Sequence, residues 1–282
     1  MDAYFYFMLE GHDRPLGYMH RSILEVLDLP RPWNIDRERR LVTLTGQPTF
    51  AARTEVMRTT LQIAVDQKLP TGPRKFYNEA IGVYAEDGEH LMDMDRSGLD
   101  PFGVVSYSAH LVAYADTEAG RKYWVPKRSK SKETVPSMLD SSVGGVKRSS
   151  ENPLECMVRK TRAETSIPED YLRAHLQACG TASYQMSITS TGSPGCQHII
   201  HYLYELPMTT DMTPTPNDEV EKFTLMSLEE VFLALRSGQF VANRAMIWLS
   251  YLVRHGIINP QTESEYTELC TRLQRKHLLF VA

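Results

Sequence analysis

Short extended segments and helices alternate in the N-terminal third of the chain. The segments whose aromatic, β-branched or alternating residues predict strands are Tyr4–Leu9, Leu41–Leu44, Tyr77–Tyr84 and Glu89–Met94. Ser22–Leu27 and Thr54–Asp66 instead have apolar residues at helical spacing, and Thr49 or Thr54 is available to cap the longer helix. The pattern therefore predicts a small mixed α/β unit.

From residue 103 onward the strands become longer and are followed by helices. The predicted strands are Val104–Tyr114, its hairpin partner Lys122–Val125 across Asp116–Gly120, then Gly180–Ser187 and His198–Leu206 around a turn at Ser190–Gly195. The predicted helices are Ser149–Thr165 (capped by Ser150 or Asn152, with Pro153 in its first turn), one opening at the capping box Ser227–Glu230, Asn243–His255, and one from Thr262–Glu265 to about Lys276. We expect an α/β protein with two domains, residues 1–102 and 103–282.

Composition narrows the class of protein and its partners. The chain has 282 residues, 42% hydrophobic and 23% charged, with a net charge of −4, which is typical of a globular protein and indicates neither a nucleic-acid nor a membrane partner. Four cysteines without CxxC spacing predict free thiols and no zinc site. No signal peptide or membrane-length apolar run is evident, so we expect a cytoplasmic protein.

Residues 144–167, GGVKRSSENPLECMVRKTRAETSI, carry the most specific motif of the chain. Gly145, Glu151 and Arg159 have the spacing of the first three fixed positions in the pattern G-x5-E-x7-R-E-U-x-E-E-x-G-U, where U is aliphatic. This segment resembles a Nudix box. The resemblance implies a Nudix fold, in which a mixed sheet is sandwiched between helices, here preceded by the small N-terminal α/β domain.

The wider chain resembles one Nudix subfamily, which includes fungal thiamin pyrophosphokinase-related proteins and plant plastid Nudix proteins. The segments that carry this likeness are Lys130–Gly145, Phe102–Tyr114, Asn217–Phe240 and Tyr251–Ile257. The N-terminal region is similar to the extra domain of that subfamily. The resemblance implies hydrolysis of a thiamin-like or other small organic diphosphate.

The box departs from the family pattern where the metal ligands are expected. In the family, acidic residues one helical turn apart hold Mg²⁺, which neutralises the diphosphate and positions water. Those positions hold Lys160, Ala163 and Glu164. Glu164, with Glu151, is the candidate Mg²⁺ ligand, whereas the resemblance gives Glu151 and Arg159 a structural ion pair.

Basic residues next to the box are candidates for substrate binding. Arg128, Lys130 and Lys132 lie in the loop that leads into it and could clamp phosphates, although a solvated loop is the simpler interpretation. Lys160 could hold a phosphate in place of the metal, or be a helix-surface lysine. The expected partner is a phosphorylated small molecule, and no pattern specifies an oligomeric state.

Histidines on the predicted strands supply candidate acid–base groups. His110 and His201 could transfer protons together with Lys160 and Glu164, or be satisfied core residues. His198 and His201, three apart on one strand, are expected to face opposite ways and not to share a metal. Three hypotheses follow: a Nudix-like hydrolase with reduced or altered metal dependence, a Nudix fold recruited for metal-free isomerase or cyclase chemistry in a specialised biosynthetic pathway, or a non-catalytic metabolite-binding protein.

Overall fold

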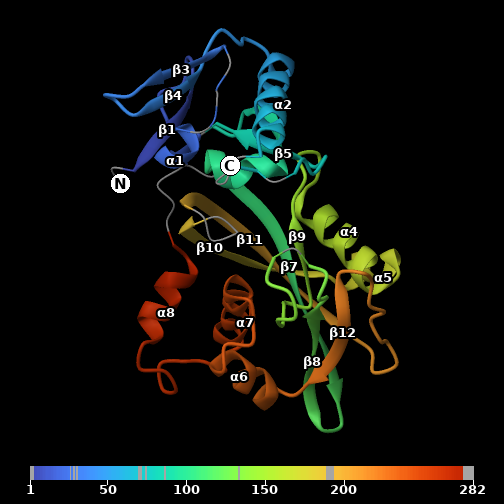
Figure 1. Cartoon of the computed structure of the whole chain (residues 1–282). Coiled ribbons are helices and arrows are strands. Elements are labelled where there is room, and N and C mark those ends of the chain that lie inside the picture. Colours follow the sequence, from blue (N-terminus) through green and yellow to red (C-terminus); the bar gives the residue numbers. More distant parts are fainter. Residues whose placement is uncertain are drawn as a thin grey trace.

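The computed structural model describes residues 3–25, 27, 29, 31–68, 72–73, 75–85, 87–132, 134–188 and 194–275. An N-terminal part with its own small sheet lies above a longer, strongly twisted sheet flanked by helices (Figure 1). No helix within these ranges is long and apolar enough to span a bilayer. Most of the predicted turn at Ser190–Gly195 and the predicted helix end at Lys276 lie outside the described residues.

The N-terminal part is built around a four-stranded sheet of order β2-β1-β4-β3. Its strands are β1 (Tyr4–Leu9), β2 (Gly17–His20), β3 (Trp33–Asp36) and β4 (Leu41–Leu44), and the other elements are α1 (Arg21–Leu24), α2 (Phe50–Asp66), the hairpin β5 (Ala80–Tyr84) and β6 (His90–Asp95), the 3-10 turn Arg96–Gly98 and α3 (Leu99–Phe102). Thr49 caps α2, as predicted, by accepting a hydrogen bond from the backbone N–H of Ala52. Phe7, Leu44 and Met57 are fully buried in the cluster that holds this part together.

The larger sheet has the order β10-β11-β7-β8-β12, with β9 paired to β7. Its strands are β7 (Val105–Thr117), β8 (Gly120–Arg128), β9 (Val143–Val146), β10 (Gln177–Ile188), β11 (Pro194–Met208) and β12 (Val220–Met226). Strand β7 forks: residues 108–111 pair with β9, and residues 114–117 pair with β8. Ser142 closes the fork, because its hydroxyl donates to the Trp124 carbonyl (2.6 Å) and accepts from the Ala113 N–H (2.8 Å).

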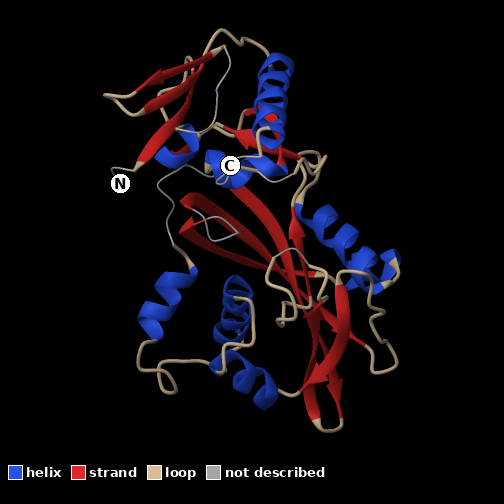
Figure 2. Ribbon diagram, viewed as in Figure 1, coloured by secondary structure: helices blue, strands red, loops and turns tan. Residues whose placement is uncertain are grey.

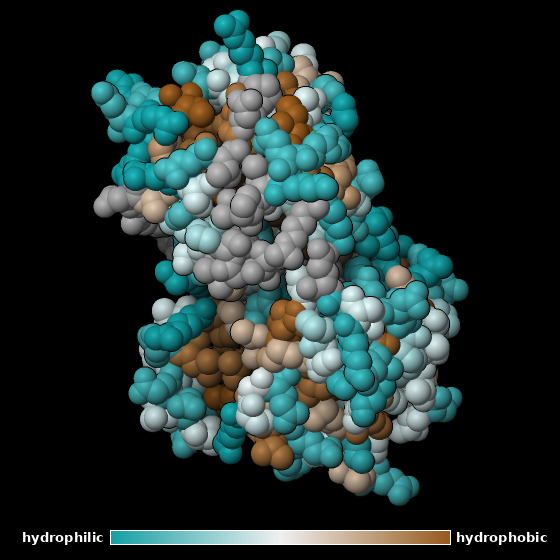
Figure 3. Space-filling model, viewed as in Figure 1, coloured by the Kyte–Doolittle hydropathy of each residue, from teal (hydrophilic) through white to brown (hydrophobic). Residues whose placement is uncertain are grey.

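Helices cover both faces of this sheet (Figures 1 and 2). They are α4 (Pro153–Thr165) and α5 (Glu169–His175) on one face, and α6 (Leu228–Arg236), α7 (Ala242–Arg254) and α8 (Tyr266–Leu273) on the other. Successive side chains of β7 point to opposite faces of the sheet, each of which has its own hydrophobic cluster. Leu111 packs in the cluster with α4, and Val112 packs in the cluster with α7. Hydrophobic side chains are still visible among the C-terminal helices in Figure 3. Leu249 and Leu269 are only partly buried where they pack against the cluster with α7.

Two glycines let β2 lie close to the end of α3 and the segment that leads into the larger sheet. A Cβ atom on Gly17 would lie 2.2 Å from the Phe102 carbonyl oxygen, and one on Gly103 would lie 2.2 Å from that of Tyr18. Gly103 also has φ of 57°, which favours glycine. The apolar cluster of the N-terminal part extends to Val104; the domain boundary after residue 102 stays a prediction.

The predicted α/β class is confirmed, and the differences concern short or polar elements. The sequence pattern missed β2, β3, α3, β9, α5 and β12, which are short or lack a regular alternation of apolar and polar residues. Helix α1 ends at Leu24, earlier than predicted, and α8 covers only Tyr266–Leu273. The capping box of α6 is present, with Ser227 and Glu230 each bonded to the other's backbone.

Candidate active site

The start of α4 is fixed by an ion pair between Glu151 and Arg159. Asn152 caps the helix, and Pro153 begins it. The Arg159 guanidinium contacts both oxygens of Glu151, with Nη2 2.9 Å from Oε2, and also donates to the Val146 carbonyl (3.2 Å). Burial acts to raise the pKa of Glu151, but the bonds from Arg159 outweigh it and lower that pKa. This pair, which the family resemblance implied, ties the loop before α4 to the helix.

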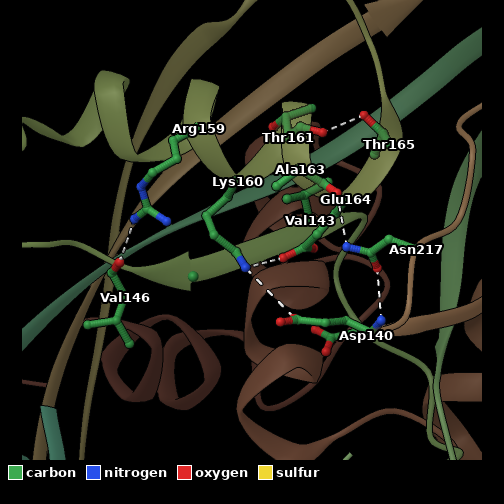
Figure 4. A network of polar contacts seen from close by, with 12 residues as sticks. Asp140, Val143, Val146, Arg159, Lys160, Thr161, Ala163, Glu164, Thr165 and Asn217 are labelled. Carbon is green, nitrogen blue, oxygen red and sulfur yellow. Dashed lines mark hydrogen bonds and ion pairs between the residues drawn. The ribbon is translucent and has the colours of Figure 1, made fainter. Parts of the chain in front are cut away.

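A second ion pair, between Lys160 and Glu164, lies near the end of α4. The Lys160 stem crosses β9 at Gly145, where a Cβ atom would lie 2.6 Å from the lysine side-chain carbons. Its ammonium contacts the Glu164 carboxylate (Figure 4). It also lies 3.8 Å from the Glu219 carboxylate. The side chains of Lys160 and Glu164 are only 17% and 9% exposed. Lys160 is thus an internal cation of the site and not a surface lysine.

The charges around this pair shift the titration of both partners. Burial acts to lower the pKa of Lys160, but the carboxylates of Glu164 and Glu219 outweigh it and raise that pKa. Burial also raises the pKa of Glu164, and Glu219 and Asp140 add to that rise against the opposing effect of Lys160. The ammonium therefore stays charged and balances a group of carboxylates.

Asp140, on the segment between β8 and β9, connects two further cations to the site. Its carboxylate accepts from Arg128 Nη1 at 2.7 Å and lies 3.0 Å from Arg244 Nε on α7. Lys132 is paired with Glu219 in the same manner. The predicted phosphate clamp of Arg128, Lys130 and Lys132 is therefore not a set of open cations, because two of them already bind carboxylates and Lys130 is exposed at the surface.

The loop before β12 brings Glu219 to α4. The side-chain amide of Asn217 donates to the Ala163 carbonyl (2.9 Å), and its oxygen accepts from the Glu219 N–H (2.9 Å). Figure 4 shows Asn217 bridging to the last turn of α4 beside Glu164. The loop thus completes a centre, called here the Lys160 centre, whose members are Arg128, Lys132, Asp140, Lys160, Glu164, Glu219 and Arg244.

The two candidate histidines meet behind this centre, on the face of the sheet toward α7. The rings of His110 and His201 lie 4.5 Å apart and are almost fully buried. His110 accepts from or donates to Ser141 through Nδ1 (3.0 Å), and its Nε2 lies 3.2 Å from Arg244 Nη1. Burial, followed by the charge of Arg244, lowers the pKa of both histidines well below the usual range. Both rings are consequently neutral at physiological pH.

Other predicted candidates are kept apart by the fold. His198 contacts Cys196 Sγ (2.9 Å) and stacks on Tyr18, away from the His110–His201 pair. Glu151 precedes α4 and Glu164 lies in its last turn, so on the order of 15 Å of helix separates them. The structure therefore does not bring Glu151 and Glu164 together as ligands of one metal ion.

The residues present do not fit Mg²⁺, the ion that the box resemblance implies. Within the described ranges, no group of three or more His, Cys, Asp or Glu side chains is placed to hold a metal. Ala163 offers no side-chain oxygen, and the Lys160 ammonium occupies the space beside Glu164. A dication needs several oxygen ligands and is repelled by a fixed cation at contact distance, so Glu164 and its neighbours are unsuited to Mg²⁺.

A surface hollow of about 410 Å³ lies on the outer side of α4 and α5 and includes Ala163. Its cations are neutralised locally, since Arg162 pairs with Glu169, and Arg173 pairs with Glu155 and Glu169. It lacks the buried charges of the Lys160 centre.

The geometry of the box segment agrees with the comparison to known sequences. The profile of the NUDIX domain matches residues 108–249, about half of the chain. The chain belongs to the Nudix family. Its six-stranded mixed sheet with helices on both faces is the Nudix fold that the box predicted.

Two curated proteins are similar to this Nudix chain over most of its length. An uncharacterised protein of Saccharomyces cerevisiae, YJR142W, is 31% identical over 216 residues, which are 73% of this chain and 63% of that protein. Nudix hydrolase 20, chloroplastic, of Arabidopsis thaliana is 26% identical over 230 residues, covering 79% of this chain and 58% of that protein. The chain thus spans about six tenths of the length of these relatives.

Solved structures are more distant. DR0079 from Deinococcus radiodurans is 22% identical with a TM-score of 0.43, covering 70% of this chain and all of that one. The NUDIX domain of Shewanella oneidensis NrtR, solved with ADP ribose, is 12% identical with a TM-score of 0.42, covering 56% of this chain and 91% of that one.

Three members of the Lys160 centre were not found from the sequence: Asp140, Glu219 and Arg244. Asp140 and Glu219 both lie in segments that carry the subfamily likeness, which was the available signal. Arg244 gave no signal, because it reaches the centre only through the packing of α7 against the sheet.

Proposed function

We propose that this chain is an enzyme that acts on a small organic diphosphate with little or no dependence on Mg²⁺. The observation that carries the proposal is the Lys160 ammonium, held between Glu164 and Glu219 on the helix of the Nudix box. A fixed cation in a site with little water can neutralise a phosphate without reorganisation. The name of the Arabidopsis relative, a Nudix hydrolase, supports hydrolysis as the reaction.

The charge balance of the Lys160 centre also supports an anionic ligand. Four cations face three carboxylates, which leaves one net positive charge. An incoming phosphate would exchange with carboxylates for Lys160 and Arg244, and a bidentate guanidinium contact would orient it. The substrate class, an organic diphosphate, is inferred from the family and from this charge.

Phosphate release from thiamin diphosphate and prenyl diphosphates tests the proposal when it is measured with Mg²⁺ and with excess chelator. We expect the two rates to agree within about twofold, and Lys160→Met to lower the rate by roughly a hundredfold, the loss typical of one electrostatic stabiliser. Arg173→Met, a cation outside the centre, serves as the matched control and should leave the rate unchanged. A rate that disappears with chelator would overturn the proposal.

Metal-free isomerase or cyclase chemistry is the second candidate, and it is supported by the neutral, buried His110–His201 pair. Mass spectrometry of the same reactions separates the two, because an isomer forms without loss of phosphate. A ligand that binds and is recovered unchanged from every reaction would instead identify a binding protein.

A further inference from the structure

Beside the Lys160 centre lies a group of buried polar atoms whose hydrogen-bonding capacity is not used. Among the described residues, His201 Nε2 and Asn243 Oδ1 are buried without a hydrogen-bond partner. Buried polar atoms in folded proteins nearly always have partners, and the exceptions concentrate where a ligand or ordered water binds. Both atoms adjoin Tyr184: its ring centroid lies 5.4 Å from that of His201, and its hydroxyl accepts from Asn243 Nδ2 at 2.9 Å.

His201 Nε2 is without a hydrogen-bond partner in either tautomer of the ring. Its Nδ1 lies 2.5 Å from the Ser108 hydroxyl, which can either donate to it or accept from it. In the first case Nε2 carries a proton with no acceptor, and in the second it is an acceptor with no donor. Burial keeps the ring neutral, because it lowers the pKa of His201 well below the usual range. His201 can therefore serve as donor or acceptor but not as a charged partner.

One side-chain amide atom of Asn243 is likewise without a hydrogen-bond partner in either orientation of the amide. If its oxygen and nitrogen are exchanged, Tyr184 donates to the oxygen and the nitrogen loses its partner instead. In the structure, the Tyr184 hydroxyl accepts a hydrogen bond from Asn243 and keeps its own hydrogen to donate. His201, Tyr184 and Asn243 together therefore have unused hydrogen-bonding groups for at least one neutral oxygen.

Arg244 connects this group to the Lys160 centre. It lies next to Asn243 on α7, contacts Asp140 through Nε (3.0 Å), and reaches His110 Nε2 through Nη1 (3.2 Å). The His110 ring in turn lies 4.5 Å from that of His201. A ligand whose phosphates exchange onto Lys160 and Arg244 would therefore place its organic part toward His201.

We propose that His201, Tyr184 and Asn243 form a subsite for a neutral oxygen, a hydroxyl or carbonyl, on the organic part of the substrate. The proposal rests on the proposed function for the position of the diphosphate. A hydroxyl that satisfies a buried partner discriminates strongly against the analogue that lacks it, because the analogue leaves the protein atoms unpaired. The subsite would thus select oxygenated diphosphates over plain hydrocarbon ones.

Binding of paired probes tests the subsite by calorimetry on the full chain. The probes are ω-hydroxyalkyl diphosphates of increasing chain length, each compared with the n-alkyl diphosphate of the same length. We expect the hydroxyl to tighten binding about tenfold at the length that reaches the subsite, and this gain to disappear in Ser108→Ala/His201→Leu. A gain below about twofold at every length, with the alkyl diphosphates still bound, would overturn the subsite and leave the proposed function standing.

Thermal unfolding tests the subsite without any ligand. Ser108→Ala/His201→Leu removes both partners of one hydrogen bond together with the unpartnered Nε2, so we expect the melting temperature to rise. His198→Leu is the matched control on the same strand, equally buried but bonded to Cys196, and it should lower the melting temperature and keep the hydroxyl gain. If no diphosphate binds, the proposed function fails, and a fall in the melting temperature of the double variant would then overturn the subsite as well.

Discussion

Two adjacent residues of α4, Arg159 and Lys160, form ion pairs with different roles. Arg159 and Glu151, which precedes the helix, keep the spacing and the contact of the family framework, and they hold a loop. Near the end, Lys160 pairs with Glu164 where the family resemblance places acidic metal ligands. Compared with the box pattern, this helix keeps the ion pair that holds the loop, and it carries Lys160 and Ala163 at two positions where the pattern has acidic residues.

The comparison separates what a box motif specifies about structure from what it specifies about chemistry. Gly145 leaves no space for a side chain of its own, because the Lys160 stem passes where its Cβ atom would lie. Gly144 is similarly required by the His110 ring, whose Nδ1 would lie 2.1 Å from a Cβ atom there. The glycines of the motif now accommodate the substituted centre.

Replacing the cations of α4 and α5 by methionine, one at a time, tests the comparison, and Lys160→Met should have the largest effect. It leaves the Glu164 carboxylate buried beside Glu219 and Asp140 without its cation. We expect a loss of about 3 to 5 kcal/mol in the free energy of unfolding, measured with urea. Adding Glu164→Gln to Lys160→Met should recover part of this loss. If Lys160→Met alone were as stable as the wild type, Lys160 would not balance a buried charge.

The pH dependence of stability should be next in size, because the folded state keeps His110 and His201 neutral. Their pKa values are lowered on folding, so the unfolded chain binds more protons once the pH falls below its histidine pKa of about 6.5, and stability is lost as pH falls. Two such groups cost about 2 kcal/mol between pH 6.5 and 5.5. The raised pKa of Glu164 acts in the opposite direction nearer pH 4.5.

The same urea measurements at several pH values, repeated on Ser108→Ala/His201→Leu, check this expectation. That variant should show about half of the loss, since one of the two histidines is gone. An unchanged slope would mean that His201 is protonated in the folded protein.

Arg159→Met should have an intermediate effect. Its partner Glu151 retains the Arg148 N–H as a donor (3.1 Å), and the pair is nearer to solvent than the Lys160 pair. We expect a loss of about 1 to 2 kcal/mol by urea unfolding. A loss equal to that of Lys160→Met would remove the distinction between the two ion pairs of α4.

Arg173→Met should have the smallest effect. Its contacts with Glu155 and Glu169 lie at the surface, where water screens ion pairs and side-chain entropy opposes them. The urea midpoint should coincide with that of the wild type, and a clear shift would show that the surface network of α4 and α5 is a structural element.

Much of the fold was predictable because its elements have strong local signals. The Thr49 cap, the Asn152–Pro153 helix start and the Ser227–Glu230 capping box each fix a helix end through bonds within a few residues. Strands β9 and β12 escaped prediction, because Val143–Val146 is short and half glycine and the apolar residues of Val220–Met226 do not alternate strictly with its polar ones.

Members of the Lys160 centre were found from the sequence where they lie within the box or in the basic loop before it. Lys160 and Glu164 are one helical turn apart, so their contact follows from the sequence. Asp140, Glu219 and Arg244 come from three other segments and meet only at the fork of β7, which depends on sheet register and on the packing of α7. For the same reason the sequence did not predict that Asp140 and Glu219 pair with Arg128 and Lys132. These cations were therefore expected to be available for phosphates.

The most direct test of a centre balanced by Lys160 is calorimetric titration with Mn²⁺ of the wild type and of Lys160→Glu/Ala163→Glu, which restores the acidic box positions. We predict no binding at millimolar Mn²⁺ for the wild type and saturable binding for the double variant, whose added carboxylates join Glu164 on one face of α4. Saturable binding by the wild type that is lost in Glu164→Gln would contradict the account.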